Sequence, residues 1–385
     1  MERPVPYRFG APVYRPWFCD REAELDVLCS RMRAGIHLIV LSPRRYGKTS
    51  LLLQAADILE RDGVHSAYAN LLLATTEVEL ASIILQAVVR SVLGPVARRR
   101  HSLEDALRHL RITPKVSVGP DGAVSLGLDP AVVGTSWVDV ITDAVALLER
   151  ASVRRSAVLV FDEFQVVAGI GRRGVGGAFK ALADAARRTS LVFSGSHLAI
   201  MEQLTKGSGA PLHGMGERVV LDVVPEDPMA GYLQRRARSA GKTLPKPVAR
   251  EIYAQAGTVP NYVQQLAQAA LEAADAADAA TITPAHVAAG FDTVVERQSA
   301  VYAQQYEDLG GAPAQQRILR TLARTPTASV YAKGFLDAVH VANANAVTTA
   351  LRVLDNRELV TRRGSTWHVA DPFLRRWLTA QSPAI

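Results

Sequence analysis

The segment from Ser42 to Thr49, Ser-Pro-Arg-Arg-Tyr-Gly-Lys-Thr, constrains the fold of this 385-residue chain more than any other feature. It follows the continuous apolar run 36–41, which is typical of a buried parallel strand, and it precedes a helical pattern over 49–60. A Gly-Lys-Thr sequence between a strand and a helix is the context in which phosphate-binding loops occur. We therefore predict an α/β fold in which this loop joins a central strand to a helix.

The chemistry of the loop suits the phosphates of a nucleotide. Backbone N–H groups at the start of a helix carry partial positive charge, and Gly47 lets the backbone approach the phosphates without an intervening side chain. We expect Lys48 to reach the β- and γ-phosphates and the hydroxyl of Thr49 to hold Mg²⁺. Ser42 stands where such loops usually have their first glycine, ahead of the part that supplies the amides. The predicted nucleotide contacts in the loop are Arg45, Tyr46, Gly47, Lys48, Thr49 and Ser50.

A second apolar run, 157–161, ends in two carboxylates, Asp162 and Glu163. At the tip of a strand beside the phosphate loop, Asp162 is expected to share the Mg²⁺ ion with Thr49, and Glu163 is expected to polarise the attacking water as general base. A third strand pattern ends just before Ser196, whose hydroxyl would contact the γ-phosphate or that water, or would only shape a turn. The expected cofactors are ATP and Mg²⁺.

Strand and helix patterns alternate up to about residue 225, and helical patterns alone follow. The alternation predicts a parallel sheet covered on both faces, and Asp20 is expected to cap the first helix. The length of the chain favours two or three domains. The predicted parts are an extended N-terminal strap, 1–20; a P-loop ATPase core of the AAA/ASCE-like type, 21–225; an insertion within that core, 95–136, with a hairpin around Asp121-Gly122; an all-helical lid, 226–305; and a winged helix-turn-helix domain, 310–382.

The C-terminal part is predicted to be a winged helix because three helix patterns precede two short strands joined at Gly364-Ser365. Its third helix offers Thr348 and Arg352, and the following strands, the wing, offer Arg362 and Arg363; these residue types contact base edges and phosphates of duplex DNA. From Gly310 onward ten Arg or Lys stand against four Asp or Glu, so this part holds +6 of the total net charge of +7. The surplus fits either an anionic partner or a solvated face.

These motifs together resemble the archaeal-type ATPases, which belong to the STAND branch of the AAA-like P-loop proteins. The resemblance covers most of the chain. Beside the phosphate loop, it is carried by Phe18–Leu25, Asp162–Gln165, Ser194–Ser196, Gly257–Tyr262 and Asp371–Leu378. It implies that the strands of the core sheet lie in the order 5-1-4-3-2.

The resemblance also implies contacts with the adenine base. In that family a Gly-Gly-x-Pro-x-Tyr turn of the lid lies over the base, so Pro260 is expected to touch it, and Thr258 stands where a glycine is commoner. The entry segment lies near the base as well, which makes Phe18 and Arg21 candidate contacts. Pro260 would otherwise be an ordinary first residue of a helix.

Two functions agree with these motifs. In the first, ATP closes the lid on the core, hydrolysis releases it, and the winged helix transmits this state to an unidentified protein partner. In the second, the chain is a DNA-binding ATPase whose layout of core, lid and winged helix resembles that of origin-recognition proteins. A chain that binds ATP without hydrolysing it is a third alternative, against which Glu163 argues. Nucleotide-dependent oligomers are compatible with either function, and no arginine finger is assigned.

Several other classes of protein are not indicated. Cys19 and Cys29 form no disulfide framework, and no Cys or His spacing suggests a zinc site. The apolar runs are far too short for a membrane span, and no apolar run follows Arg3 and Arg8 as in a signal peptide. We therefore expect a cytoplasmic location and no membrane partner.

Overall fold

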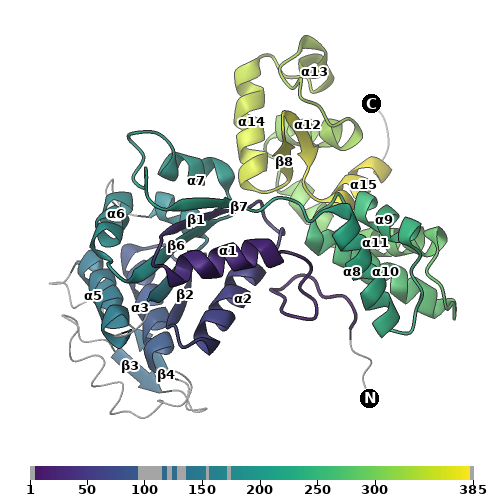
Figure 1. Ribbon diagram of the computed structural model, residues 1–385. Helices are drawn as coiled ribbons and strands as arrows, with labels where there is room; N and C mark the ends of the chain where they lie inside the picture. The colour runs from purple at the N-terminus through teal and green to yellow at the C-terminus, as the bar shows by residue number, and fades with distance from the viewer. Residues whose placement is uncertain are drawn as a thin grey trace. The chain divides into compact units, whose positions relative to one another are not determined.

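Five parallel strands form the sheet that carries the predicted phosphate loop in the computed structural model (Figure 1). They lie in the order β2–β5–β6–β1–β7. Counted along the chain this is 2-3-4-1-5, which read from the other edge is the predicted order 5-1-4-3-2. The strands are β1 Leu38–Leu41, β2 Ser66–Asn70, β5 Ala157–Asp162, β6 Thr189–Gly195 and β7 Glu217–Val220.

The structure describes residues 5–93, 115–118, 124–127, 136–152, 156–170 and 175–381. The chain divides into two compact units, one of Arg21–Asp222 and the other of Met1–Asp20 with Val223–Ile385, and each is described by itself. In the described part of the chain no helix is both long enough and apolar enough to cross a bilayer.

Helices cover both faces of the sheet in the unit Arg21–Asp222. One face, with Ile39, Leu159 and Phe193, shares a continuous buried core with α3, α5 and α6. Helices α1 and α2 pack against each other and contact strands of the same sheet. The helices are α1 Glu22–Arg33, α2 Lys48–Arg61, α3 Glu77–Leu93, α5 Trp137–Ala151, the 3-10 helix η1 Phe164–Gly169, α6 Val175–Ala185 and α7 Leu198–Thr205.

Four phenylalanines pack together just beneath the carboxyl ends of two central strands. Phe161 ends the apolar part of β5 and Phe193 lies in β6, with their ring centroids 5.3 Å apart. Phe164 of η1 and Phe179 of α6 complete the group at 4.9 Å from each other. Such buried rings contribute large apolar areas and fix the strand ends, which places the polar residues that follow them.

The structure bears on two expectations about local structure. The hairpin in the insertion is present as β3 Lys115–Val118 and β4 Val124–Gly127, which pair antiparallel, and its Asp121-Gly122 turn lies outside the described residues. The prediction that Asp20 caps the first helix is wrong. Helix α1 begins at Glu22 after Arg21, and both Asp20 and Arg21 have left-handed backbone conformations, with φ of 55° and 76°.

In the other unit, the strap is fastened to the first lid helix, α8 Glu226–Ser239. The buried Tyr7 donates its hydroxyl hydrogen bond to the carbonyl of Leu233 at 2.8 Å, and Arg236 Nε donates to the carbonyl of Pro6 at 2.7 Å. The remaining lid helices are α9 Lys246–Gln255, α10 Pro260–Ala276 and α11 Pro284–Glu307.

The C-terminal elements are those of a winged helix, and their last helix packs on the lid. Phe373 of α15 lies 4.8 Å from Phe291 of α11 between ring centroids, and Trp377 Nε1 donates to Ser299 Oγ at 3.0 Å. Lid and winged helix are therefore joined by a buried apolar contact. The elements are α12 Pro313–Arg324, α13 Lys333–Ala338, α14 Ala344–Asn356, β8 Val360–Arg363, β9 Thr366–Val369 and α15 Pro372–Ala380.

Candidate nucleotide site

The loop between β1 and α2 has the backbone shape of an anion cradle. Arg45 and Gly47 are both left-handed, with φ of 68° and 88°, and Lys48 begins α2 directly after Gly47. Alternation of right- and left-handed residues turns successive N–H groups toward one side, and the first turn of a helix adds more such groups. Ser42 is fully buried and its hydroxyl donates to the carbonyl of Pro43, so it serves the start of the loop.

Asp162 is the hub of the polar residues at this edge of the sheet. Its Oδ1 accepts hydrogen bonds from Lys48 Nζ at 2.9 Å and from Ser194 Oγ at 2.7 Å. Its Oδ2 accepts one from Thr49 Oγ1 at 2.9 Å and another from the hydroxyl of Tyr68. Two predicted loop residues thus meet the predicted carboxylate, together with two residues from neighbouring strands.

The hub keeps Asp162 ionised although only 1% of it is exposed. Burial by itself raises the pKa of Asp162, but the ammonium of Lys48 and the hydrogen bonds from Tyr68 and Ser194 outweigh it, so the pKa lies below its ordinary value. Burial, and then the negative charge of Asp162, raise the pKa of Tyr68, so this phenol stays protonated and acts only as a donor to the carboxylate.

The oxygen atoms at the hub fit a magnesium ion. Mg²⁺ prefers oxygen ligands and is usually held by one or two protein groups together with substrate phosphates and water. Thr49 Oγ1 and Asp162 Oδ2 lie 2.9 Å apart beside the loop, and Asp162 is charged. Among the described residues, no group of three or more His, Cys, Asp or Glu side chains is arranged to hold a metal ion by itself. A magnesium site at Thr49 and Asp162, with its other ligands supplied by phosphate oxygens and water, agrees with this geometry.

Glu163 follows the hub and has an unusual backbone. Its φ is 56°, a left-handed value that non-glycine residues adopt mainly where surrounding contacts enforce it, often at functional sites. Its Oε2 accepts hydrogen bonds from Ser196 Oγ at 2.7 Å and from Gln165 Nε2 at 2.5 Å, and its Oε1 lies 3.8 Å from Lys48 Nζ. The predicted base therefore lies beside the predicted phosphate-binding lysine.

The residues expected near the adenine lie in different units. Arg21 is buried and its guanidinium donates to Glu24 Oε1 at 2.7 Å and to the carbonyl of Asp222, both within its own unit. Pro260 is the first residue of α10 in the other unit, and Phe18 lies in the strap. Thr258 has φ of 65°, a conformation that a glycine adopts without strain. This accounts for the glycine that is commoner at this position of the motif in the family that the sequence resembles.

The predicted groove-reading residues of the winged helix are at its surface. Thr348 and Arg352 are exposed on α14, and Val347, Leu351 and Leu354 of the same helix are buried. Arg362 and Arg363 are exposed on β8. In the described part of the chain, none of these three arginines has a carboxylate within ion-pair distance.

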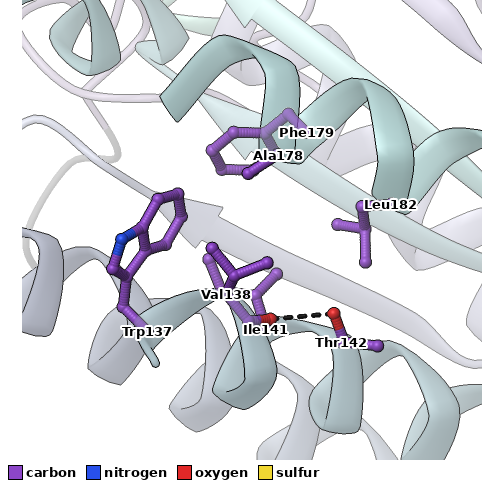
Figure 2. A pocket seen from close by; sticks show the side chains of 7 residues that line it. All are labelled: Trp137, Val138, Ile141, Thr142, Ala178, Phe179 and Leu182. Atoms are coloured by element: carbon purple, nitrogen blue, oxygen red, sulfur yellow. Dashed lines mark hydrogen bonds between the residues drawn. The ribbon is translucent and has the colours of Figure 1, made fainter. Parts of the chain in front are cut away.

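The unit Arg21–Asp222 also has a small hollow whose lining differs from the polar hub. Figure 2 shows an apolar notch between α5 and α6, in which the hydroxyl of Thr142 is turned to the backbone carbonyl of Val138 at 2.8 Å. The described residues that line it include no charged side chain, so they offer nothing that would bind phosphate. Its lining consists of Trp137, Val138, Ile141, Thr142, Ala178, Phe179 and Leu182.

Three residues that contact Asp162 or Glu163 were not predicted from the sequence, namely Tyr68, Ser194 and Gln165. Ser194 lies near the carboxyl end of β6, whereas Tyr68 lies in the middle of β2, where the register with β5 pairs it with Val160, two residues before Asp162. Gln165 stands two residues after Glu163 in the segment Asp162–Gln165, which carries part of the family resemblance. A polar residue at the carboxyl end of a parallel strand was the signal that could have revealed Ser194.

Comparison with known proteins identifies the C-terminal domain and the fold. A family model described as "probable winged helix domain" matches residues 300–380. No curated protein matches the chain. A Walker-type ATPase of Pyrococcus abyssi has a similar structure, with a TM-score of 0.68 at 17% identity, and the match covers 97% of this chain and 99% of that one.

Two proteins of Aeropyrum pernix, ORC2 and ORC1, are also similar in structure. The ORC2 protein, in its ADPNP-ADP complexes, has a TM-score of 0.56 at 16% identity over 98% of this chain and 97% of its own. The ORC1 protein, in complex with DNA, has a TM-score of 0.50 at 16% identity over 95% of each chain. At such identities the likeness concerns the fold, which is a P-loop NTPase core followed by a helical region and a winged helix.

Proposed function

We propose that this chain is an ATP-binding and ATP-hydrolysing molecular switch of the archaeal-type STAND ATPases, and that its nucleotide state controls the winged helix as an interaction module. The observation that carries the proposal is the convergence of Lys48, Thr49 and Asp162 at the carboxyl edge of the sheet. Lys48 and the loop amides would bind the phosphates, Thr49 and Asp162 would hold Mg²⁺, and Glu163 would accept the proton of the attacking water. Bound Mg²⁺ would neutralise charge that develops on the phosphates.

The packing of the winged helix on the lid supports a switch. A nucleotide that contacts lid and core differently in its two states shifts the balance of lid positions. Because α15 is packed on α11 through Phe373 and Trp377, a lid movement would carry the winged helix with it. The proposed limits of the moving parts are the lid at 226–305 and the winged helix at 310–382.

Hydrogen exchange tests the switch. With ATP and Mg²⁺ we expect backbone amides of residues 257–263, which form the turn before α10 and the start of that helix, to exchange on the order of tenfold more slowly than with ADP, since closure protects them. Mass spectrometry of deuterium uptake measures this difference. The Lys48→Ala variant serves as control and should show none. Identical uptake in both nucleotides for the wild-type chain would contradict a lid that responds to the γ-phosphate.

A second candidate function is a DNA-binding ATPase or regulator, for which the exposed arginines of the winged helix argue. Arg352 on α14 and Arg362 and Arg363 on β8 present three guanidinium groups to solvent. Guanidinium groups bind phosphates and guanine edges, and winged helices place their third helix in the major groove. Protein-binding winged helices share this fold, so the charge pattern is what favours duplex DNA as the partner.

Salt-dependent binding separates the two candidates. If duplex DNA is the partner, affinity should fall steeply between 50 and 200 mM salt and should differ between ATP and ADP. Replacing Arg362 and Arg363 together by alanine should lower the slope of log affinity against log salt by about 2, close to one per lost phosphate contact. Fluorescence anisotropy with a labelled duplex measures both quantities. Absence of binding at low salt in either nucleotide state would leave a protein partner as the one to be sought.

A further inference from the structure

Two side chains, those of Gln165 and Ser196, hold the carboxylate of Glu163 in place. Gln165 and Ser196, which we call the carboxylate clamp, both donate to the same oxygen of Glu163, Oε2, at 2.5 and 2.7 Å. They are joined to each other as well, because Ser196 N donates to Gln165 Oε1 at 3.3 Å and Gln165 Nε2 lies 3.4 Å from Ser196 Oγ. Both side chains are buried, with 8% of each exposed.

The backbone around the clamp leaves room for it. A Cβ atom on Gly195 would lie 2.8 Å from Gln165 Oε1 and 2.4 Å from the side chain of Met201, so a side chain at this position would displace Gln165 or Met201. On the other side Glu163 itself is left-handed, with φ of 56°, and the clamp contributes to holding it there. Gly195, Gln165 and the backbone of Glu163 thus all favour the same orientation of the Glu163 carboxylate.

The clamp also touches the phosphate loop. Arg44 Nε donates to Ser196 Oγ at 3.3 Å, so the hydroxyl that donates to Glu163 accepts from the loop. With Oε2 taken up by the clamp, Oε1 of Glu163 faces Lys48 Nζ at 3.8 Å. A general base acts only when one oxygen lies within hydrogen-bond reach of the water proton, and small displacements of such a group are costly.

We propose that Gln165 is a positioning residue for hydrolysis, which, with Ser196, anchors one carboxylate oxygen of Glu163 so that the other faces the attacking water. This inference rests on the proposed ATPase function and concerns the same site. In this proposal the hydroxyl of Ser196 binds Glu163, whereas the sequence led us to expect that it contacts the γ-phosphate or the water directly. The water gives its proton to Oε1 as its oxygen attacks the γ-phosphorus and the bond to ADP breaks, while Oε2 stays bound to the clamp.

The test replaces Gln165 by leucine, which has a similar size and no donor. We expect kcat for ATP to fall on the order of 10- to 100-fold while the Kd for ATP stays within twofold of wild type, because the phosphates are bound elsewhere. Gln54→Leu is the matched control, since Gln54 is a buried glutamine of α2 whose Oε1 has no hydrogen-bond partner among the described residues, and its kcat should be unchanged. Unchanged kcat for Gln165→Leu with intact ATP binding would overturn the proposal.

A second measurement needs no turnover. Gln165→Leu and Glu163→Ala each remove the same hydrogen bond. In urea unfolding without nucleotide, the double variant should therefore lower the midpoint concentration of urea by less than the sum of the decreases in the two single variants. Gln54→Leu combined with Glu163→Ala should be additive. Additive losses for the Gln165 pair would show that the clamp does not hold Glu163. A wild-type chain that binds ATP without turnover would instead refute the proposed hydrolysis. The urea midpoints of the single and double variants would still show whether Gln165 holds Glu163.

Discussion

Replacing Lys48 by alanine is expected to weaken ATP binding roughly 100-fold or more. The side chain of Lys48 is 4% exposed and its Nζ lies 2.9 Å from Asp162 Oδ1, so the ammonium is held at the hub without a bound phosphate. A lysine that serves two phosphates makes charge-assisted hydrogen bonds worth roughly 1.5–3 kcal/mol each, and every 1.4 kcal/mol is tenfold in affinity. Titration with a fluorescent ATP analogue and competition by ATP measures the change.

The same substitution has a cost for folding, which the experiment must separate from binding. Without Lys48 the carboxylate of Asp162 is buried and lacks its cation, and breaking such a pair costs roughly 3–5 kcal/mol. Binding should therefore be measured well below the unfolding midpoint, which circular dichroism provides. Lys180→Ala, at an exposed position of α6, is the control and should bind ATP like wild type. Equal affinity of wild type and Lys48→Ala, both folded, would contradict the site.

Replacing Glu163 by glutamine is expected to keep ATP binding and to lower kcat by about 10²–10⁴, the usual contribution of a general base. The amide has nearly the shape of the carboxylate but cannot accept the proton of the water. Phosphate release under saturating ATP measures kcat, and calorimetric titration checks that the Kd stays within twofold.

Glu202→Gln is the matched control for this prediction. Glu202 is an exposed carboxylate on α7 that pairs with Lys206 and not with a hub residue, and its loss should leave kcat as in wild type. Wild-type turnover in Glu163→Gln would rule out Glu163 as the base. Loss of ATP binding in this variant would assign Glu163 a part in holding the nucleotide instead.

The sequence predicts those features of the fold that depend on local pattern. The apolar runs before Ser42 and Asp162 form β1 and β5, because buried parallel strands need continuous apolar residues. Gly47 precedes a helix and has a left-handed backbone, which is why glycine is found there. The strand order came from the family resemblance, since periodicity says nothing about which strands are neighbours.

Features that depend on distant contacts could not be predicted in this way. Asp20 has the composition of a helix cap, yet Arg21 precedes α1 and its guanidinium binds the carbonyl of Asp222, some two hundred residues away. Tyr68 donates to Asp162 because β2 and β5 are neighbours in the sheet. Gln165 meets Ser196 because η1 and β6 meet over Gly195. Such side-chain pairs become visible only when the packing is known.

The central claim is that the phosphates of ATP bind in the loop from Ser42 to Thr49. A crystal structure of Glu163→Gln grown with ATP and Mg²⁺ tests it most directly, because this variant should retain the uncleaved nucleotide. We predict density for a triphosphate against the backbone amides from Gly47 to Ser50, with Lys48 Nζ in contact with its oxygens. A nucleotide bound elsewhere, or a loop without one at saturating ATP, would contradict the account.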